Sequence, residues 1–240
     1  RRIRIGFVST FFRDGTVGRY FEHWITELPR ADFDVHVYHL APGTDALVER
    51  IGARADAFRR CPWWQPSRIA AQVRADELDV VVYPELGMGA IAFALAALRL
   101  APLQCAAWGH PVTTGQATID VYFSSAAMEP ADDASHYAEK LVTLPGIGTR
   151  YAAPAVPADA TRKHFGLTEA DILLLCPQSL FKIHPDNDAL FARVLAAIPR
   201  ALLVCFEGRD PRLTARYLAR LAAAGIATER VRVLPQCAHD

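Results

Sequence analysis

The sequence predicts an α/β protein with two parallel-sheet domains, the second of them incomplete. Short apolar runs alternate with stretches of helical spacing along nearly the whole chain, a pattern typical of parallel strands joined by helices. The Pro- and Ala-rich segment Arg150–Ala158 has no such period and interrupts the alternation. We therefore expect a first domain over residues 1–150, a linker over residues 151–160 and a partial second domain over residues 161–240.

Composition and charge exclude several classes of function. The 240 residues are 52% hydrophobic, enough for a buried core, and 26 basic residues balance 26 acidic ones. This balance argues against a nucleic-acid partner bound through bulk charge. No apolar run reaches the ~20 residues that cross a bilayer, so no membrane partner is expected. The five cysteines are scattered without a CxxC pair, and Arg1-Arg2 leads directly into a strand pattern. We expect reduced thiols, no signal peptide and a cytoplasmic location.

Six strands and four helices are expected in the first domain. The strands are apolar or alternating runs: Arg2–Ser9, Phe33–His39, Asp79–Tyr83, Leu103–Ala107, Ile119–Ser124 and Lys140–Leu144. The helices place apolar residues on one face: Val17–Leu28, Asp45–Ala53, Ser67–Ala75 and Ile91–Leu98. Ser67 is expected to cap its helix, and Cys61–Trp64 to form a loop or short edge. His36 and His39 lie three apart on a strand and point to opposite faces, so they do not predict a metal site.

Two polar loops follow strands of this domain. In an open α/β sheet, ligands bind at the carboxyl ends of the strands. Pro84–Gly89 is a glycine-containing loop at one such end, and Trp108–Gly115 follows the next strand. In the second loop, glycines allow close backbone approach, while two threonines and His110 supply hydrogen-bonding groups. His110 is a candidate general acid or base, ligand-binding group or structural cap, and the residues alone leave these roles open.

The second domain restarts the same alternation. Strands are expected at Ile172–Cys176, Ala201–Cys205 and Val231–Leu234, with helices at Thr161–Leu167, Pro185–Ala197 and Pro211–Ala224. The run Ile172–Cys176 is apolar throughout and predicts a buried parallel strand. Three strands are few for a doubly wound domain, so we expect this unit to be incomplete.

The loop Gln178–Lys182 and the helix after it predict an anion site. Pro185 suits a first helical position, and free N–H groups at a helix start can meet a phosphate. Of the 26 basic residues, only Lys140, Lys163 and Lys182 are lysines. The hypothesis is that Lys182 and the helix start hold a diphosphate; the alternative is a solvated loop lysine.

Five stretches, taken in order, resemble the O-linked N-acetylglucosamine transferase family, especially its bacterial members with tetratricopeptide repeats. They are RIGFVSTFFRDGTVGRYF, LDVVVYPELGM, ALRLAPLQCAAWGHPVTTGQATIDVYFSS, MEPADDASHYAEKLVTLPGIG and CPQSLFKIHPDNDALFARVLAAIP. The resemblance implies a GT-B architecture of two Rossmann-like domains facing a cleft. It implies transfer of N-acetylglucosamine from UDP-GlcNAc to Ser or Thr hydroxyls of a protein or peptide, without a metal or other cofactor. The repeats that present acceptors would lie on the N-terminal side, outside this chain.

The resemblance also assigns roles by position. Lys182 matches the lysine that contacts the diphosphate and steadies departing UDP, and Gln178 and Ser179 share its nucleotide-contacting loop. Gly109, His110 and Pro111 match a first-domain loop that closes over the sugar-phosphate. The uracil-recognising loop corresponds to Gln236 and Cys237, with His239 nearby. A positioned cation stabilises the charge that UDP gains on leaving, which agrees with these roles.

Two positions depart from the family pattern, and other functions stay open. Gly15 and Asp79 align with family histidines proposed as general bases, which makes Asp79 a further catalytic candidate. The run Asp186-Asn187-Asp188 falls in a first helical turn, where the helix dipole explains it better than manganese binding. WGHPVTT is also similar to cytoplasmic N-glucosyltransferases, which use UDP-glucose and Asn acceptors. A degenerate, non-catalytic nucleotide- or protein-binding domain is the alternative outside enzymes.

Overall fold

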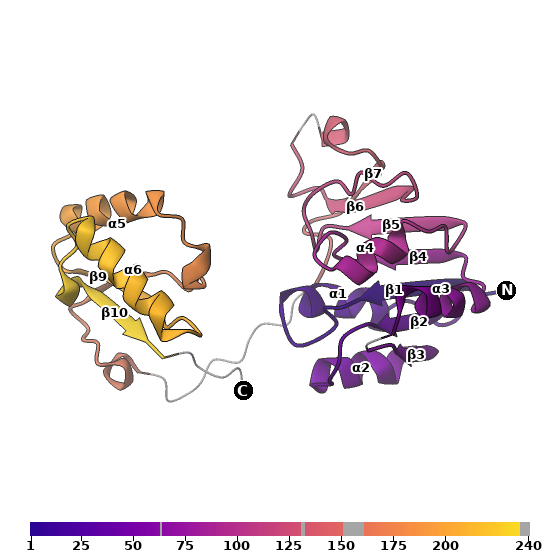
Figure 1. Ribbon diagram of the computed structural model, residues 1–240, viewed down its shortest axis with the longest axis horizontal. Helices are drawn as coiled ribbons and strands as arrows, with labels where there is room; N and C mark the ends of the chain where they lie inside the picture. Colours follow the sequence, from indigo (N-terminus) through magenta and orange to yellow (C-terminus); the bar gives the residue numbers. More distant parts are fainter. Residues whose placement is uncertain (63, 131–132, 151–160, 236–240) are drawn as a thin grey trace. The chain divides into compact units, whose positions relative to one another are not determined.

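The computed structural model describes residues 1–62, 64–130, 133–150 and 161–235. The chain divides into two compact units, Arg1–Ala153 (unit 1) and Pro154–Asp240 (unit 2), each built on its own parallel sheet (Figure 1). This confirms the predicted α/β class. The predicted linker, residues 151–160, lies outside the described residues. No helix in the described ranges is both long and apolar enough to cross a membrane.

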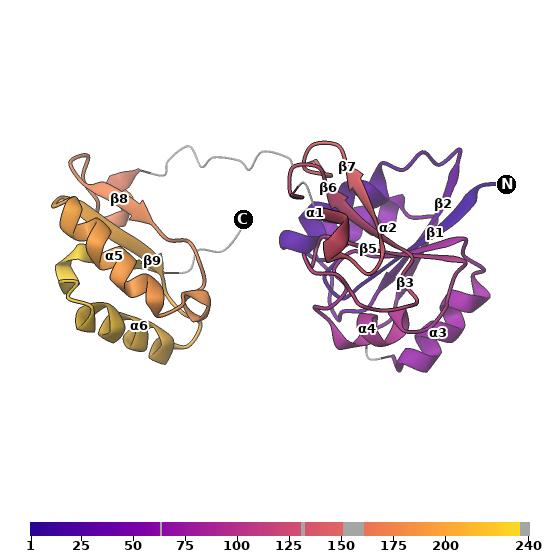
Figure 2. The ribbon, with the colours of Figure 1, turned by 90° about the horizontal axis from the view of Figure 1, so that it is seen from above.

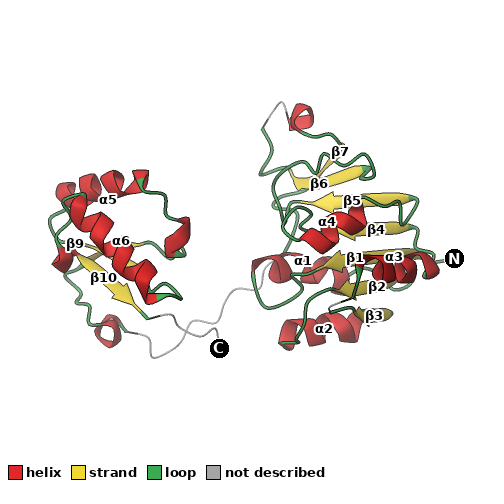
Figure 3. Cartoon of the chain, viewed as in Figure 1, coloured by secondary structure: helices red, strands yellow, loops and turns green. Residues whose placement is uncertain are grey.

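Unit 1 contains a seven-stranded parallel sheet in the order β3-β2-β1-β4-β5-β6-β7 (Figure 3). Its strands are β1 Ile3–Ser9, β2 Phe33–His39, β3 Ala57–Arg60, β4 Val80–Tyr83, β5 Leu103–Ala107, β6 Val121–Ser125 and β7 Lys140–Leu144. The order reverses between β1 and β4, which are hydrogen-bonded neighbours. Ligands of open α/β sheets bind at such a switch point, outside the carboxyl ends of the strands.

Helices cover both faces of this sheet. They are α1 Thr16–Thr26, α2 Ala46–Arg54, α3 Pro66–Ala75 and α4 Ala90–Ala96. Successive β1 side chains point to opposite faces: Phe7 belongs to the core beneath α1 and α2, and Val8 to the core shared with α3 and α4. The expected strands and helices are present because the apolar residues, spaced at the strand or helix period in the sequence, face one or the other of these two cores.

Two local predictions in unit 1 were wrong. Strand β3 was not expected, because its sequence AFRR is short and half charged; its pairing with β2 creates it. The cap of α3 is Gln65, with Pro66 in the first turn, and Ser67 lies inside the helix. Asp45 does cap α2, since its carboxylate accepts the N–H groups of Leu47 and Val48.

Unit 2 contains a three-stranded parallel sheet in the order β10-β9-β8 within the described residues. The strands are β8 Ile172–Leu175, β9 Ala201–Phe206 and β10 Val231–Leu234, and the helices are α5 Asp186–Ala197 and α6 Pro211–Ala223. Short 3-10 turns of this unit are η2 Arg162–Phe165, η3 Leu180–Lys182 and η4 Thr228–Arg230. A further 3-10 turn, η1 Asp133–His136, belongs to unit 1. Figure 2 shows β8 at one side of this sheet. The prediction that β8 is buried was wrong: among the described residues it pairs with β9 alone, and Leu175 is 60% exposed.

Candidate functional site

Loops after β4 and β5 of unit 1 meet beside the switch point. The Gly109 N–H donates to the Pro84 carbonyl at 2.9 Å, and a Cβ on Gly109 would lie 2.5 Å from that same oxygen. The His110 ring lies against Gly87, whose φ is +113° and where a Cβ would approach the ring to 2.5 Å. Both glycines are therefore required by close approach, and the two loops predicted to bind ligand are brought together.

Glu85 is a buried carboxyl at this switch point that sequence reasoning passed over. It is 1% exposed, and its Oε1 accepts a 2.8 Å hydrogen bond from Ser9 Oγ at the end of β1. Ser9 Oγ in turn accepts the Phe11 N–H at 2.8 Å. Burial raises the pKa of Glu85 to about 7, although the Ser9 hydrogen bond opposes this shift. The available signal was an acidic residue directly after an apolar strand and before a glycine loop.

The threonines after His110 tie the loop to Glu139. Thr113 Oγ1 donates to Glu139 Oε2 at 2.7 Å, and the Thr114 N–H and hydroxyl both donate to Glu139 Oε1. Burial alone would raise the pKa of the Glu139 carboxyl, but the hydrogen bonds from Thr114 and Thr113 lower it. Tyr122 OH donates to the His110 carbonyl at 2.6 Å. Both threonine hydroxyls therefore donate within unit 1, to Glu139.

In unit 2, Lys182 projects from an exposed turn. It ends η3, and its N–H donates to the Ser179 carbonyl at 2.9 Å. The Lys182 Nζ lies 5.8 Å from the centre of the Phe181 ring, and no carboxylate of the described residues pairs with it. Gln178 and Ser179 belong to the same exposed turn, where Gln178 Oε1 accepts the Ser179 N–H at 2.9 Å.

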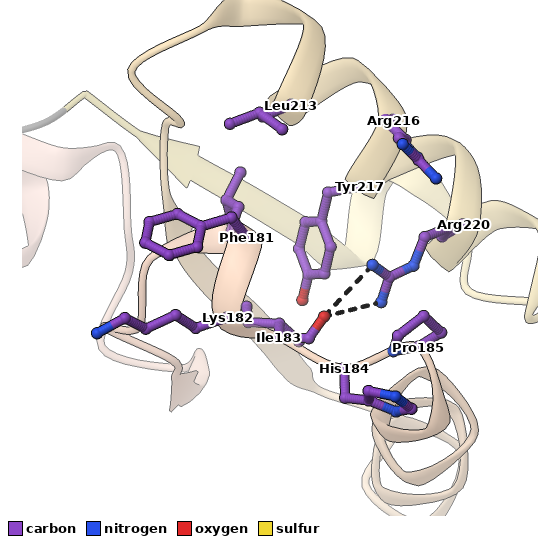
Figure 4. A pocket seen from close by; sticks show the side chains of 10 residues that line it. Phe181, Lys182, Ile183, His184, Pro185, Leu213, Arg216, Tyr217 and Arg220 are labelled. Carbon is purple, nitrogen blue, oxygen red and sulfur yellow. Dashed lines mark hydrogen bonds between the residues drawn. The ribbon is translucent and has the colours of Figure 1, made fainter. Parts of the chain in front are cut away.

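The turn borders an open pocket of about 330 Å³ between η3 and α6 (Figure 4). Phe181, Leu213 and Tyr217 supply apolar walls, and Arg216 and Arg220 line the α6 side. In Figure 4 the Lys182 amine extends away from Arg220. Arg220 is neutralised by Asp188, so Lys182 and Arg216 carry the unpaired positive charge of this pocket among the described residues.

The expectation of free N–H groups at the start of α5 is corrected. The Asn187 N–H donates to the His184 carbonyl at 3.0 Å, and the Asp188 N–H donates to the Pro185 carbonyl at 2.9 Å. The Asp186 N–H faces His184 Nδ1 at 3.4 Å. Because the turn before the helix takes these donors, the anion-binding capacity of this loop rests on the Lys182 ammonium.

Other predicted residues lie elsewhere. Asp79 precedes β4 at the amino edge of the sheet, whereas His110 follows β5 at the carboxyl edge, so the structure does not bring them together. Asp79 forms a 2.7 Å ion pair with Arg1 and accepts the Arg4 N–H at 2.9 Å. Pro111 is exposed beside the half-buried Gly109 and His110. The predicted uracil-site residues Gln236, Cys237 and His239 lie outside the described residues.

The acidic pair Asp186 and Asp188 does not converge on one point. Asp186 faces His184 at 3.4 Å, while Asp188 is buried and pairs with Arg220. Over the described ranges, no group of three or more His, Cys, Asp or Glu side chains is arranged to hold a metal ion. The arrangement offers a cation on one unit and a rigid polar loop on the other.

Two parallel sheets, each with helices packed on it and connecting loops at the carboxyl ends of its strands, define an α/β protein with Rossmann-like units. The sequence model described as Glycosyl transferase family 41 matches residues 1–150. This chain belongs to that family.

Comparison with known proteins agrees with this membership. The chain is 28% identical over 248 residues to the probable UDP-N-acetylglucosamine–peptide N-acetylglucosaminyltransferase SPINDLY of Arabidopsis thaliana, covering 98% of this chain and 26% of that protein. The plant relative SEC is 24% identical over 211 residues, covering 85% of this chain and 22% of its own length. The chain thus spans about a quarter of the length of the curated relatives it matches.

Solved structures give the same picture. An O-GlcNAc transferase mutant from Thermobaculum terrenum matches with a TM-score of 0.82 and 30% identity, covering 100% of this chain and 45% of that one. A glycosyltransferase from Rickettsia africae matches with a TM-score of 0.58 and 11% identity, covering 98% of this chain and 69% of that one. The second likeness shows the fold alone.

Proposed function

We propose that this chain is the catalytic region of a protein glycosyltransferase that moves N-acetylglucosamine from UDP-GlcNAc to Ser or Thr hydroxyls. Membership of Glycosyl transferase family 41 supports this function, as do relatives named as UDP-GlcNAc–peptide N-acetylglucosaminyltransferases. The observation that carries it is Lys182, an exposed ammonium at the carboxyl end of β8 without an acidic partner among the described residues.

In this proposal, Lys182 donates to the diphosphate and stabilises the negative charge that UDP gains on leaving. Charge-assisted hydrogen bonds of this kind contribute about 1.5–3 kcal/mol each. Gln178 and Ser179 offer further polar contacts from the same turn. On unit 1, the backbone of Gly109, His110 and Pro111 forms the wall of the sugar-phosphate site, which the Glu139 and Tyr122 hydrogen bonds make rigid before the donor arrives.

The proposal includes transfer without a metal, because Lys182 supplies the countercharge that a divalent ion would otherwise bring. It also includes a bacterial, cytoplasmic enzyme whose acceptor proteins are presented by tetratricopeptide repeats, with no role for nucleic acid or membranes. Full activity in excess EDTA is the expected result for metal independence. Loss of activity that Mn²⁺ restores would contradict it.

The direct test is transfer by the full natural chain that contains these residues. The enzyme would be incubated with a peptide mixture and either UDP-GlcNAc or UDP-glucose, and the modified side chain identified by fragmentation mass spectrometry. N-acetylglucosamine on Ser or Thr is the expected product. Glucose on Asn would instead indicate an N-glucosyltransferase, and no transfer from either donor would indicate a non-catalytic domain.

Lys182→Ala is expected to lower kcat/KM about 10- to 150-fold, which corresponds to the loss of one charge-assisted contact. Lys163→Ala is the matched control, since Lys163 is an exposed lysine of the same unit that lies in η2. Equal activity of the two variants would remove Lys182 from its role.

A further inference from the structure

We propose that Arg220 and Asp188 act as positioning residues that hold the Lys182 turn in its ligand-binding geometry. This inference rests on the proposed function, because the turn matters only if Lys182 meets a diphosphate. The two residues come from helices that do not themselves carry the lysine. They act through the backbone that follows Lys182.

The contact between the two helices is a two-point ion pair. Arg220 Nε lies 2.9 Å from Asp188 Oδ2, and Arg220 Nη2 lies 2.8 Å from Asp188 Oδ1. Asp188 is in the first turn of α5 and is 7% exposed, while Arg220 is in the last turn of α6. The parallel geometry uses the planar guanidinium fork, which a lysine ammonium does not reproduce.

The same guanidinium reaches the turn itself. Its two Nη atoms lie 3.4 and 3.3 Å from the carbonyl oxygen of Ile183, the residue directly after Lys182 (Figure 4). Ile183 is buried and caps η3, with its N–H donating to the Leu180 carbonyl at 3.2 Å. One side chain thus ties α6, the start of α5 and the end of η3 to one another.

The packing keeps the guanidinium in place. Its Cζ lies 5.6 Å from the centre of the Tyr217 ring, one turn earlier on α6, and Tyr217 is fully buried. Breaking this partly buried ion pair is costly, because it leaves the buried Asp188 carboxylate without its partner. The clamp therefore fixes the Lys182 backbone while its side chain remains exposed.

A fixed backbone lowers the conformational free energy that the Lys182 turn must give up when it binds a diphosphate. If the turn were loose, diphosphate binding would first have to order it, and the affinity would fall by that ordering free energy. With the clamp in place, only the Lys182 side chain loses freedom on binding. Weakening the clamp should therefore lower UDP affinity without removing any group that touches UDP.

Arg220→Lys in the full natural chain tests this inference, because it keeps the charge and removes the fork. Two quantities are measured: calorimetric UDP affinity, and hydrogen exchange of the Lys182 and Ile183 amides. We expect UDP to bind about tenfold more weakly and both amides to exchange faster, with α6 protection retained. Arg212→Lys is the control: Arg212 lies in the first turn of α6, is exposed and pairs with Asp210 outside the pocket, so neither quantity should change.

Unchanged exchange of these two amides in Arg220→Lys would overturn the clamp, whatever happens to UDP affinity. Asp188→Asn gives a second route to the same result, since it removes the charge and leaves the size nearly unchanged. Failure of the proposed function is seen separately, as equal UDP affinity of the parent and Lys182→Ala. Faster exchange with unaltered UDP affinity would refute the positioning role.

Discussion

The loop after β5 in unit 1 and the turn after β8 in unit 2 are both held in place by side-chain contacts, but by different numbers of them. Each follows the carboxyl end of a parallel strand, and each depends on a buried carboxylate. In unit 1, Glu139 binds the loop's own Thr113 and Thr114. In unit 2, Asp188 binds Arg220, which reaches the turn through one carbonyl. The first loop is tied at several points, and the second at one.

The number of side-chain contacts decides how many polar groups each segment leaves open to a ligand. In the unit 1 loop, the hydroxyls of Thr113 and Thr114 are both occupied by Glu139. The unit 2 turn leaves Phe181 71% exposed and the Lys182 ammonium open to a ligand. The two segments therefore differ in how many of their side chains stay open to solvent.

Removal of Glu139 should have the largest effect. Glu139→Ala removes three hydrogen bonds that the partly buried Thr113 and Thr114 donate to a carboxylate, and should lower the free energy of unfolding of unit 1 by about 4 kcal/mol. All four tryptophans lie in unit 1, so urea unfolding followed by tryptophan fluorescence measures this unit. Glu49→Ala, on the exposed face of α2, is the control and should cost under about 0.5 kcal/mol. A similar loss for both variants would contradict the assigned role.

The pH dependence of unit 1 should be the next largest effect. The folded-state pKa of Glu85 is about 7 against an ordinary 4.5, so between these pH values the folded protein keeps a proton that the unfolded chain has released. This contribution is fully present below about pH 4.5 and is lost as pH rises through 7. The full contribution is about 3 kcal/mol, most of which is lost between pH 5 and 8. Urea unfolding from pH 5 to 8 should show a falling free energy of unfolding in the parent and not in Glu85→Gln. If the free energies of unfolding of the two proteins changed with pH in parallel, the role of the Glu85 proton would be refuted.

Close packing of His110 predicts a smaller effect. Gly87→Ala combines an unfavourable positive φ with a clash against the His110 ring, and should cost about 2 kcal/mol. Gly43→Ala measures the cost of the positive φ alone, since Gly43 also has a positive φ but no atom within 4 Å of the added Cβ. It should cost about 1 kcal/mol. Equal losses in urea unfolding would mean that the His110 contact contributes nothing.

Deleting one hydroxyl from the unit 1 loop and one from the unit 2 turn should have the smallest effects on stability. Thr113→Ala removes a hydrogen bond to Glu139 and should cost about 1 kcal/mol. Ser179→Ala removes an exposed hydroxyl that makes no capping bond, and should change stability by less than about 0.5 kcal/mol. Fluorescence reports the first and circular dichroism of unit 2 the second. The reverse order would contradict the contrast between loop and turn.

The fold was largely predictable because both units repeat one simple pattern. β2, β5 and β7 coincide with their predicted bounds, since apolar runs between polar turns define parallel strands. The failures share a cause. β3 forms because it pairs with β2, and β8 is exposed because, within the part of the chain that the structure describes, it has one neighbouring strand. Neither pairing is encoded in a local period.

The candidate site was predictable only in its local part. The sequence indicated the loops around His110 and Lys182, because glycine, proline and polar residues follow strands there. It did not indicate that Glu139 and Arg220 hold these segments, since their contacts join residues 25 and 37 positions apart. Long-range pairing of buried charges depends on the completed fold.

Calorimetric titration of UDP into the full natural chain tests the central claim most directly. The parent should bind UDP with a dissociation constant in the micromolar range, Lys182→Ala about 10- to 150-fold more weakly, and Lys163→Ala as the parent does. That result would place the diphosphate on the turn after β8. UDP binding that is absent from the parent, or equally strong in Lys182→Ala, would contradict the account.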